Sequence, residues 1–183
     1  MRLAVISMRY AALLLMVGLA LAPAAPATAD ARADFDAATD AFKKGKREEA
    51  LALVTKAIDS KEASGRDLAD MHYFRAELFS GAGKLDESVA DYAKTIEIMP
   101  DYAPAYHDRA VVYSQQKKYA EALDDLARAE FLIPQSPLPF FNRGRVYELM
   151  GKRNEAIQEY RKARARAPQM KEAQEALRRL GAR

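Results

Sequence analysis

A 34-residue period runs through this 183-residue sequence and constrains its fold more than any other feature. Proline, arginine, an aromatic residue and a second basic residue all recur at this step. The recurring residues are Pro100, Pro134 and Pro168; Arg75, Arg109 and Arg143; Phe79, Tyr113 and Tyr147; and Lys94, Arg128 and Lys162. Self-similarity at a fixed period indicates structural units that stack on one another. The sequence therefore predicts a repeat array.

Each unit has the hydrophobic spacing of two helices. Large and small residues alternate at steps of four and three, which places them on one side of a helix. In the last unit these stripes are Phe140, Gly144 and Tyr147, then Ala156, Tyr160 and Ala163. Gly151 separates the two stripes, and Pro168 closes the second because proline cannot continue a helix. A small residue lets the neighbouring backbone approach while the aromatic ring fills the space beside it.

Residues 69–168 resemble three consecutive units of the tetratricopeptide repeat (TPR) family, whose pattern is W-x2-L-G-x2-Y, then A-x3-F, A and P. A weaker unit precedes them, and a single amphipathic helix that looks like a solvating cap follows. The resemblance implies an all-α fold, a short right-handed superhelix of four helix-turn-helix units with a capping helix. The expected units are about 31–68, 69–102, 103–136 and 137–170, and the expected capping helix is 171–180.

One departure from the family pattern is a pair of opposite charges. The usual leucine is an arginine, and an acid follows it sixteen residues later. The pairs are Arg75 with Asp91, Arg109 with Asp125, and Arg143 with Glu159. In the weak first unit both positions are apolar, Ala37 and Leu53, so the two positions change together. We expect an ion pair between the two helices of a unit; an anion-binding ladder of arginines is the alternative.

The resemblance places a binding surface in a concave groove lined by the first helix of each unit. The predicted partner-binding residues are Phe35, Tyr73, Phe74, His107, Asp108, Phe141, Asn142 and Arg145. Rings at regular spacing give a large contact area at low entropic cost. The alternative is that this column packs against the adjacent unit. Some family members bind C-terminal carboxylates through a Lys/Asn/Arg clamp, but the corresponding positions carry no cation here, which argues against that mode.

The sequence lacks the residue groups that catalysis or metal binding requires. With no cysteine there is no disulfide, thiolate zinc site or thiol nucleophile, and two histidines give no zinc-spaced cluster. His72 falls in the packed stripe and is expected to be a core residue. His107 and Asp108 are sequence neighbours and are not expected to face each other on a helix. We therefore expect no enzymatic activity, no cofactor and no metal.

The first 29 residues have the order of a secretory signal peptide. Arg2 and Arg9 precede an apolar stretch at 11–22, and small residues at Ala27 and Ala29 stand where a signal peptidase reads. A stretch of twelve residues is short of the roughly 20 that span a membrane. We expect cleavage after Ala29 and export, most simply to a bacterial periplasm. Secretion and an uncleaved anchor are the alternatives, and the lack of cysteine excludes a lipoprotein.

The formal charge of +3 hides a strong asymmetry. Residues 30–142 contain 15 basic and 21 acidic residues, whereas residues 143–183 contain 12 and 5. The sequence thus predicts a non-catalytic scaffold or adaptor of the cell envelope that binds a partner polypeptide in the groove, with no nucleic-acid partner. The alternative is an envelope carrier or receptor that binds glycan or anionic lipid through a basic C-terminal surface, with Arg161, Lys162, Arg164 and Arg166. Self-association through an end repeat stays open.

Overall fold

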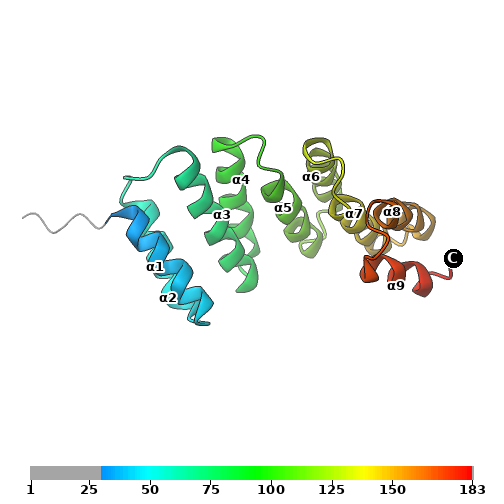
Figure 1. The fold of residues 1–183 in the computed structure, drawn as a ribbon, viewed down its shortest axis with the longest axis horizontal. Helices are drawn as coiled ribbons and strands as arrows, with labels where there is room; N and C mark the ends of the chain where they lie inside the picture. The colour runs from blue at the N-terminus through cyan, green and yellow to red at the C-terminus, as the bar shows by residue number, and fades with distance from the viewer. Residues whose placement is uncertain (1–29, 183) are drawn as a thin grey trace, which may run out of the picture.

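The computed structural model describes residues 30–182, and these residues form helices with no strand among them (Figure 1). The helices are α1 (Ala31–Lys43), α2 (Arg47–Asp59), α3 (Gly65–Gly81), α4 (Leu85–Ile98), α5 (Ala103–Gln115), α6 (Tyr119–Leu132), α7 (Leu138–Leu149), α8 (Arg153–Arg166) and α9 (Lys171–Arg179). No helix in this part of the chain is both long and apolar enough to span a membrane. The predicted signal peptide lies outside the described residues.

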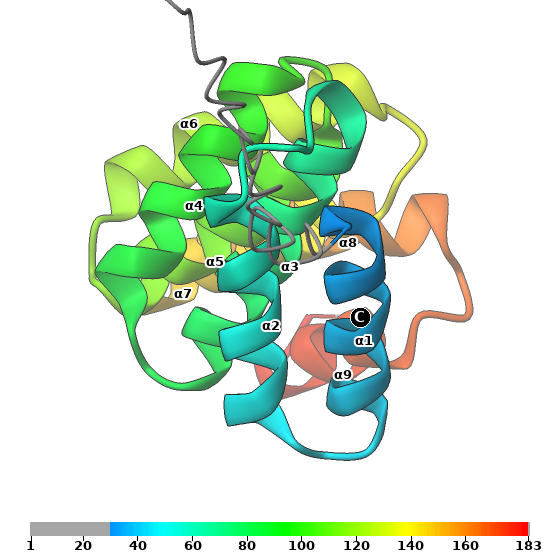
Figure 2. The same ribbon diagram turned by 90° about the vertical axis from the view of Figure 1, so that its left-hand side faces the viewer.

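The helices stack as successive pairs along the long axis of the molecule (Figure 1). The closest packing joins α1 with α2, α3 with α4, α5 with α6, and α7 with α8, and the second helix of each pair packs on the first helix of the next. The last helix, α9, packs on α8. Seen end-on in Figure 2, helices α4 to α7 are displaced to one side of α1, whereas α9 lies behind α1, so the array does not run straight. The all-α repeat superhelix expected from the sequence is confirmed.

The second pair begins earlier than the sequence suggested. The expected unit starts at residue 69, whereas α3 begins at Gly65 and is the longest of the helices described. Its extra turn places Asp67 near the helix N-terminus, where a negative charge is favourable. Asp67 also accepts a 3.1 Å hydrogen bond from Arg32 of α1. The long connection between the first two pairs is therefore partly helix.

A tight turn joins the two helices of each pair, and its backbone enters the left-handed region. Gly45, Gly83 and Gly151 have φ values of 76°, 75° and 74° there, a conformation that glycine adopts without steric cost. The turn between α5 and α6 has Lys117 in this place, with a φ of 61°. Sequence reasoning overlooked this exception.

The core is distributed along the array, because each hydrophobic cluster joins neighbouring helices. The small positions of the stripe, Ala76 and Ala110, are fully buried, as is Leu126 on the partner helix. Gly144 takes the small position in the last pair and lies against the ring of Tyr160, which is fully buried. The expected alternation of small and large residues is confirmed.

The predicted charge pairs are also confirmed. Arg75 donates two hydrogen bonds to the carboxylate of Asp91, at 2.6 and 2.9 Å, and Arg109 and Asp125 repeat this arrangement. In the last pair the arginine divides its bonds between two acids. Arg143 donates to Glu159 at 3.2 Å and to Glu130 of α6 at 2.5 Å. All three guanidinium groups are largely buried, which favours the structural interpretation over an anion-binding ladder.

His72 is more than the apolar core residue that the sequence suggested. It is largely buried, as expected, but its Nδ1 lies 2.8 Å from Oδ1 of Asp91. Asp91 thus accepts from both His72 and Arg75. Burial on its own would raise the pKa of Asp91, and these two partners outweigh burial and hold the pKa below its ordinary value.

Candidate partner-binding groove

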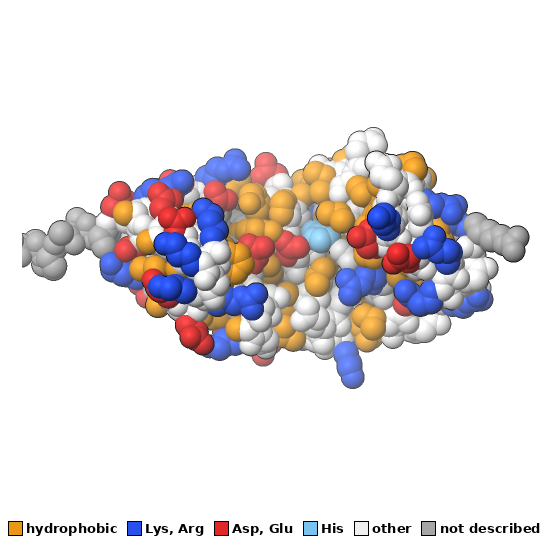
Figure 3. Space-filling model, turned by 60° about the horizontal axis from the view of Figure 1, so that its bottom comes forward, with side chains coloured by type: hydrophobic (Ala, Val, Ile, Leu, Met, Phe, Trp, Pro, Cys, Tyr) orange, Lys and Arg blue, Asp and Glu red, His pale blue; other side chains and the backbone are white. Residues whose placement is uncertain are grey.

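The four residues of the predicted column lie on successive first helices. Phe35 is on α1, Tyr73 on α3, His107 on α5 and Phe141 on α7, and each is half-buried. On the face shown in Figure 3, hydrophobic side chains alternate with acidic and basic ones, and a histidine lies among them near the middle. The column is therefore partly available to a partner and partly packed on its neighbours.

A chain of hydrogen bonds joins the predicted groove residues across three helix pairs. The hydroxyl of Tyr73 donates to Oδ2 of Asp108, and Nδ1 of His107 lies 2.8 Å from Oδ1 of the same carboxylate. On its other side, Nε2 of His107 meets Nδ2 of Asn142. Oδ1 of Asn142 then accepts a 3.4 Å bond from Arg145. A neutral imidazole that donates from Nδ1 and accepts at Nε2 satisfies every contact in this chain.

The expectation that His107 and Asp108 do not face each other was wrong. Their backbone positions diverge, as the helix geometry requires, but their side chains meet at 2.8 Å. The reason lies on the neighbouring helices. Tyr73 of α3 holds Asp108 on one side and Asn142 of α7 holds His107 on the other, so tertiary contacts select the rotamers that join the two.

The middle of the groove is acidic. Burial raises the pKa of Tyr73, and its hydrogen bond to Asp108 raises it further, so the hydroxyl stays protonated and remains a donor at neutral pH. Desolvation also raises the pKa of Glu77, and the negative charge of Asp108 adds to the effect. Tyr92 responds in the same way, first to burial and then to these two acids. The negative charge of Asp108 therefore contributes to the raised pKa of all three neighbours, Tyr73, Glu77 and Tyr92.

The N-terminal end of the groove is an aromatic cluster. The ring of Phe74 on α3 meets those of Phe35 and Phe42 edge to face, with centroids 5.7 and 5.6 Å apart. Phe35 and Phe74 pack against the core of the first pair, while Phe42 keeps 42% of its surface exposed. At this end the column serves mainly as packing between units, which was the alternative interpretation of these residues.

The C-terminal end of the groove contains two adjoining hollows. The α5–α7 hollow has a volume of about 340 Å³, and its lining includes Val111, Tyr119 and Asn142. The α7–α9 hollow has a volume of about 430 Å³, and its lining residues are Phe141, Arg145, Glu148, Leu149, Tyr160, Glu172, Glu175, Ala176 and Arg179. Arg145 and Leu149 line both, so the two hollows are neighbours on either side of these side chains. Of the predicted site residues, Phe141, Asn142 and Arg145 are brought together here.

Sequence reasoning missed several residues of this end of the groove. Leu149 is 58% exposed and belongs to both hollows, although it falls outside the packed stripe and carries no charge. Glu172 and Arg179 come from α9, which the sequence identified only as a cap. Lys117, which lines the α5–α7 hollow, was also missed. The sequence signal that could have found it is the absence of glycine at one of four otherwise regular turns.

The groove offers binding contacts from side chains that are mostly engaged with one another. Within residues 30–182, no cluster of three or more histidine, aspartate or glutamate side chains could hold a metal ion. Both histidines are engaged with aspartates, His72 with Asp91 and His107 with Asp108. What the groove presents is exposed apolar surface between fixed donors and acceptors, which suits the recognition of another molecule.

Comparisons with known proteins agree with the repeat pattern and with the fold. Residues 105–129 and 139–169 match models of the tetratricopeptide repeat. A search of curated proteins gave no match. Solved structures superpose well on the chain. Their sequence identities to it are low, so the likeness shows a shared fold and no more.

Three of these structures illustrate the likeness. YrrB, described as a TPR protein with an unusual peptide-binding site, has a TM-score of 0.73 at 19% identity, over 81% of this chain and 74% of YrrB. MamA from Desulfovibrio magneticus has a TM-score of 0.69 at 16% identity, over 83% and 93% of the two chains. The first TPR of Spaghetti (RPAP3), bound to an HSP90 peptide, has a TM-score of 0.60 at 24% identity, over 64% and 94%. Residues 105–129 and 139–169 thus match the tetratricopeptide repeat, and the described part of the chain shares the fold of these solved proteins.

Proposed function

We propose that this protein is a non-catalytic scaffold or adaptor that binds a partner polypeptide through its concave groove. The main observation in support of this proposal is the hydrogen-bond chain from Tyr73 to Arg145. It fixes the groove lining of three helix pairs before any partner binds. Binding to a surface that is already ordered avoids the entropic cost of arranging it. Two solved proteins of this fold, YrrB and Spaghetti, are described with a peptide-binding site or a bound peptide, which supports the same role here.

A photo-crosslinking residue placed in the groove should capture the partner. We choose Val111, which is half-buried on α5 and lines the α5–α7 hollow. The matched control is Ala127, which is exposed on α6 and lines neither hollow. We expect a reproducible crosslinked polypeptide from position 111 and none from position 127. Equal capture from both positions, or none from position 111, would contradict groove binding.

We further propose that the chain is exported, most simply to a bacterial periplasm, with cleavage after Ala29. The next residue, Asp30, is the N-cap of α1, and its side chain accepts a 2.9 Å bond from the backbone N–H of Arg32. Cleavage at this point would leave the helix cap intact. Protein isolated from the envelope fraction should therefore begin at Asp30 on N-terminal sequencing. Material that begins at Met1 and remains in the cytosolic fraction would contradict the proposal.

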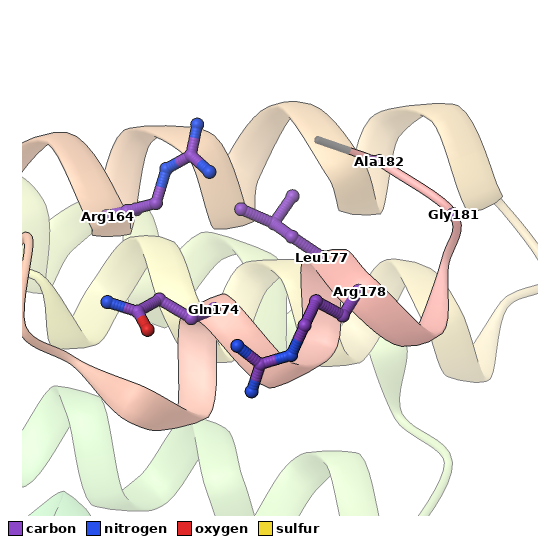
Figure 4. A pocket seen from close by; sticks show the side chains of 6 residues that line it. All are labelled: Arg164, Gln174, Leu177, Arg178, Gly181 and Ala182. Atoms are coloured by element: carbon purple, nitrogen blue, oxygen red, sulfur yellow. The ribbon is translucent and has the colours of Figure 1, made fainter.

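A second candidate function is recognition of glycan or anionic lipid at the C-terminal end. It is favoured by a hollow of about 580 Å³ between α8 and α9, where Arg164 and Arg178 lie on opposite sides (Figure 4). Fewer basic side chains are free at this surface than the sequence suggested. Lys162 pairs with Glu159 at 2.6 Å, and the guanidinium of Arg166 stacks on a phenylalanine ring. Sedimentation with phosphatidylglycerol vesicles that is lost in Arg164→Gln would favour this candidate over a peptide ligand.

A further inference from the structure

The turn between α5 and α6 is strained at Lys117, and the described residues provide no hydrogen bond or ion pair to the side chain of this lysine that would offset the strain. Lys117 adopts a φ of 61° where the other three turns have glycine, although a side chain at this φ is sterically unfavourable. Its neighbour Lys118 has a structural role, since its Nζ lies 5.9 Å from the centre of the Tyr113 ring. The amine of Lys117 makes no hydrogen bond or ion pair within residues 30–182. Strained residues of this kind concentrate at functional sites.

Lys117 lines the α5–α7 hollow, which combines apolar walls with positive charge. Val111, Tyr119 and Leu149 provide the apolar surface, and Lys117 and Arg145 provide two cations. No aspartate or glutamate is among the described residues that line it. The side chain of Arg145 has only one weak contact, the 3.4 Å bond to Asn142, and no ion pair in the described part of the chain. Both cations are therefore available to an anion.

The charge of this hollow contrasts with the rest of the groove. Asp108 and Glu77 make the middle acidic, and in the α7–α9 hollow the three acids Glu148, Glu172 and Glu175 outnumber the two cations Arg145 and Arg179. A carboxylate on a ligand is repelled at these positions and attracted between Lys117 and Arg145, so the charge pattern sets the register of a bound segment. Because Arg145 and Leu149 also line the neighbouring α7–α9 hollow, an extended ligand fits the site better than a small molecule does.

We propose that the α5–α7 hollow binds an acidic side chain of the partner polypeptide together with an adjacent large apolar side chain. The carboxylate pairs with Lys117 and Arg145, and the apolar group lies against Val111, Tyr119 and Leu149. This inference rests on the proposed function and adds the chemical class of the segment and the residues that select it. The strain at Lys117 is then the cost of placing a cation where the fold alone favours glycine.

The test begins with a random peptide library displayed on phage and selected on the full chain. We expect enrichment of peptides in which aspartate or glutamate adjoins a large apolar residue. The best peptide is then labelled and its affinity compared with that of its amide counterpart, in which glutamine or asparagine replaces the acid. Enriched peptides without an acid would overturn this inference but leave the proposed function intact. Failure to enrich any peptide would count against the proposed function itself.

The decisive variant is Lys117→Gly, with Lys61→Gly as its matched control. Lys61 also has a left-handed backbone, with a φ of 59°, but it lies in the connection after α2 and away from the hollow. Both variants relieve the same strain and remove one charge, so both should raise the melting temperature by a few degrees. Only Lys117→Gly should weaken the binding of the acidic peptide, by about fivefold. The affinity for the amide counterpart of this peptide should not change.

Arg145→Gln provides the second arm of the test. It should weaken the binding of the acidic peptide by a similar factor, because it removes the other cation and leaves a shorter, uncharged polar side chain. Equal affinities of wild type, Lys117→Gly and Arg145→Gln for the acidic peptide would overturn the assignment. The same loss in Lys61→Gly as in Lys117→Gly would also overturn it, because the effect would then be one of overall charge.

Discussion

Replacing Arg109 with alanine is expected to lower the free energy of unfolding by about 3–5 kcal/mol. Arg109 donates two 2.8 Å hydrogen bonds to the carboxylate of Asp125, and only 16% and 9% of the two side chains are exposed. Desolvation lowers the pKa of Arg109, but the bonds and charge of Asp125 outweigh it and hold the pKa above its ordinary value. Removal of the guanidinium leaves a buried carboxylate with no cation. Urea unfolding followed by circular dichroism measures the loss.

The first helix pair suggests how the loss can be reversed. It has Ala37 and Leu53 at the corresponding positions, so the fold accepts an apolar pair there. The double variant Arg109→Ala/Asp125→Leu should therefore recover most of the stability that Arg109→Ala loses, because a buried ion pair can be replaced by apolar groups at little net cost. Losses that simply add in this cycle would refute the coupling.

A surface ion pair is the control for this experiment. Lys94 and Glu97 are 2.7 Å apart, but 57% and 67% of their side chains are exposed. Lys94→Ala should cost far less stability than Arg109→Ala, because water screens an exposed pair. A comparable loss from both arginine and lysine variants would mean that burial does not set the strength of the buried pair.

The fold could be predicted from the sequence because the same spacing of residues recurs in several units. Pro100, Pro134 and Pro168 marked the unit ends, and α4, α6 and α8 end at Ile98, Leu132 and Arg166, just before them. The charge pairs could be found because both members recur at one spacing and disappear together in the first unit. Such signals are local in sequence, so no knowledge of the packed structure was needed.

The groove could be predicted only in part, because its contacts join different units. Asp108 and His107 were named as candidates, but their bond depends on Tyr73 and Asn142, each 35 residues from its partner. That distance exceeds the repeat period by one residue, so no residue recurrence reveals it. The part that Leu149 plays was hidden for a different reason, since its place in both hollows depends on where α5 and α9 lie relative to α7, which the repeat pattern does not state.

Replacing Gly144 with alanine is expected to destabilise the protein by about 1–3 kcal/mol. A Cβ atom at position 144 would lie 2.6 Å from Cε1 and 2.7 Å from Cδ1 of Tyr160. The tyrosine ring has little room to move, because it is fully buried, stacks at an angle on Phe141 and donates its hydroxyl to Glu148. This overpacking outweighs the roughly 1 kcal/mol that alanine gains over glycine within a helix. Thermal and urea unfolding both report the change.

The control and the rescue for this variant come from other units of the same chain. Gly81 is helical and has no neighbour within 4 Å of the added Cβ, so Gly81→Ala should be neutral or stabilising by up to about 1 kcal/mol. The third unit pairs its small residue with Leu126 where the last unit has Tyr160, so Gly144→Ala/Tyr160→Leu should recover most of the loss. Failure of leucine to rescue would place the strain elsewhere. Because Tyr160 lines the α7–α9 hollow, Gly144→Ala should also weaken groove ligands, linking the smallest side chain in the core to the shape of the binding surface.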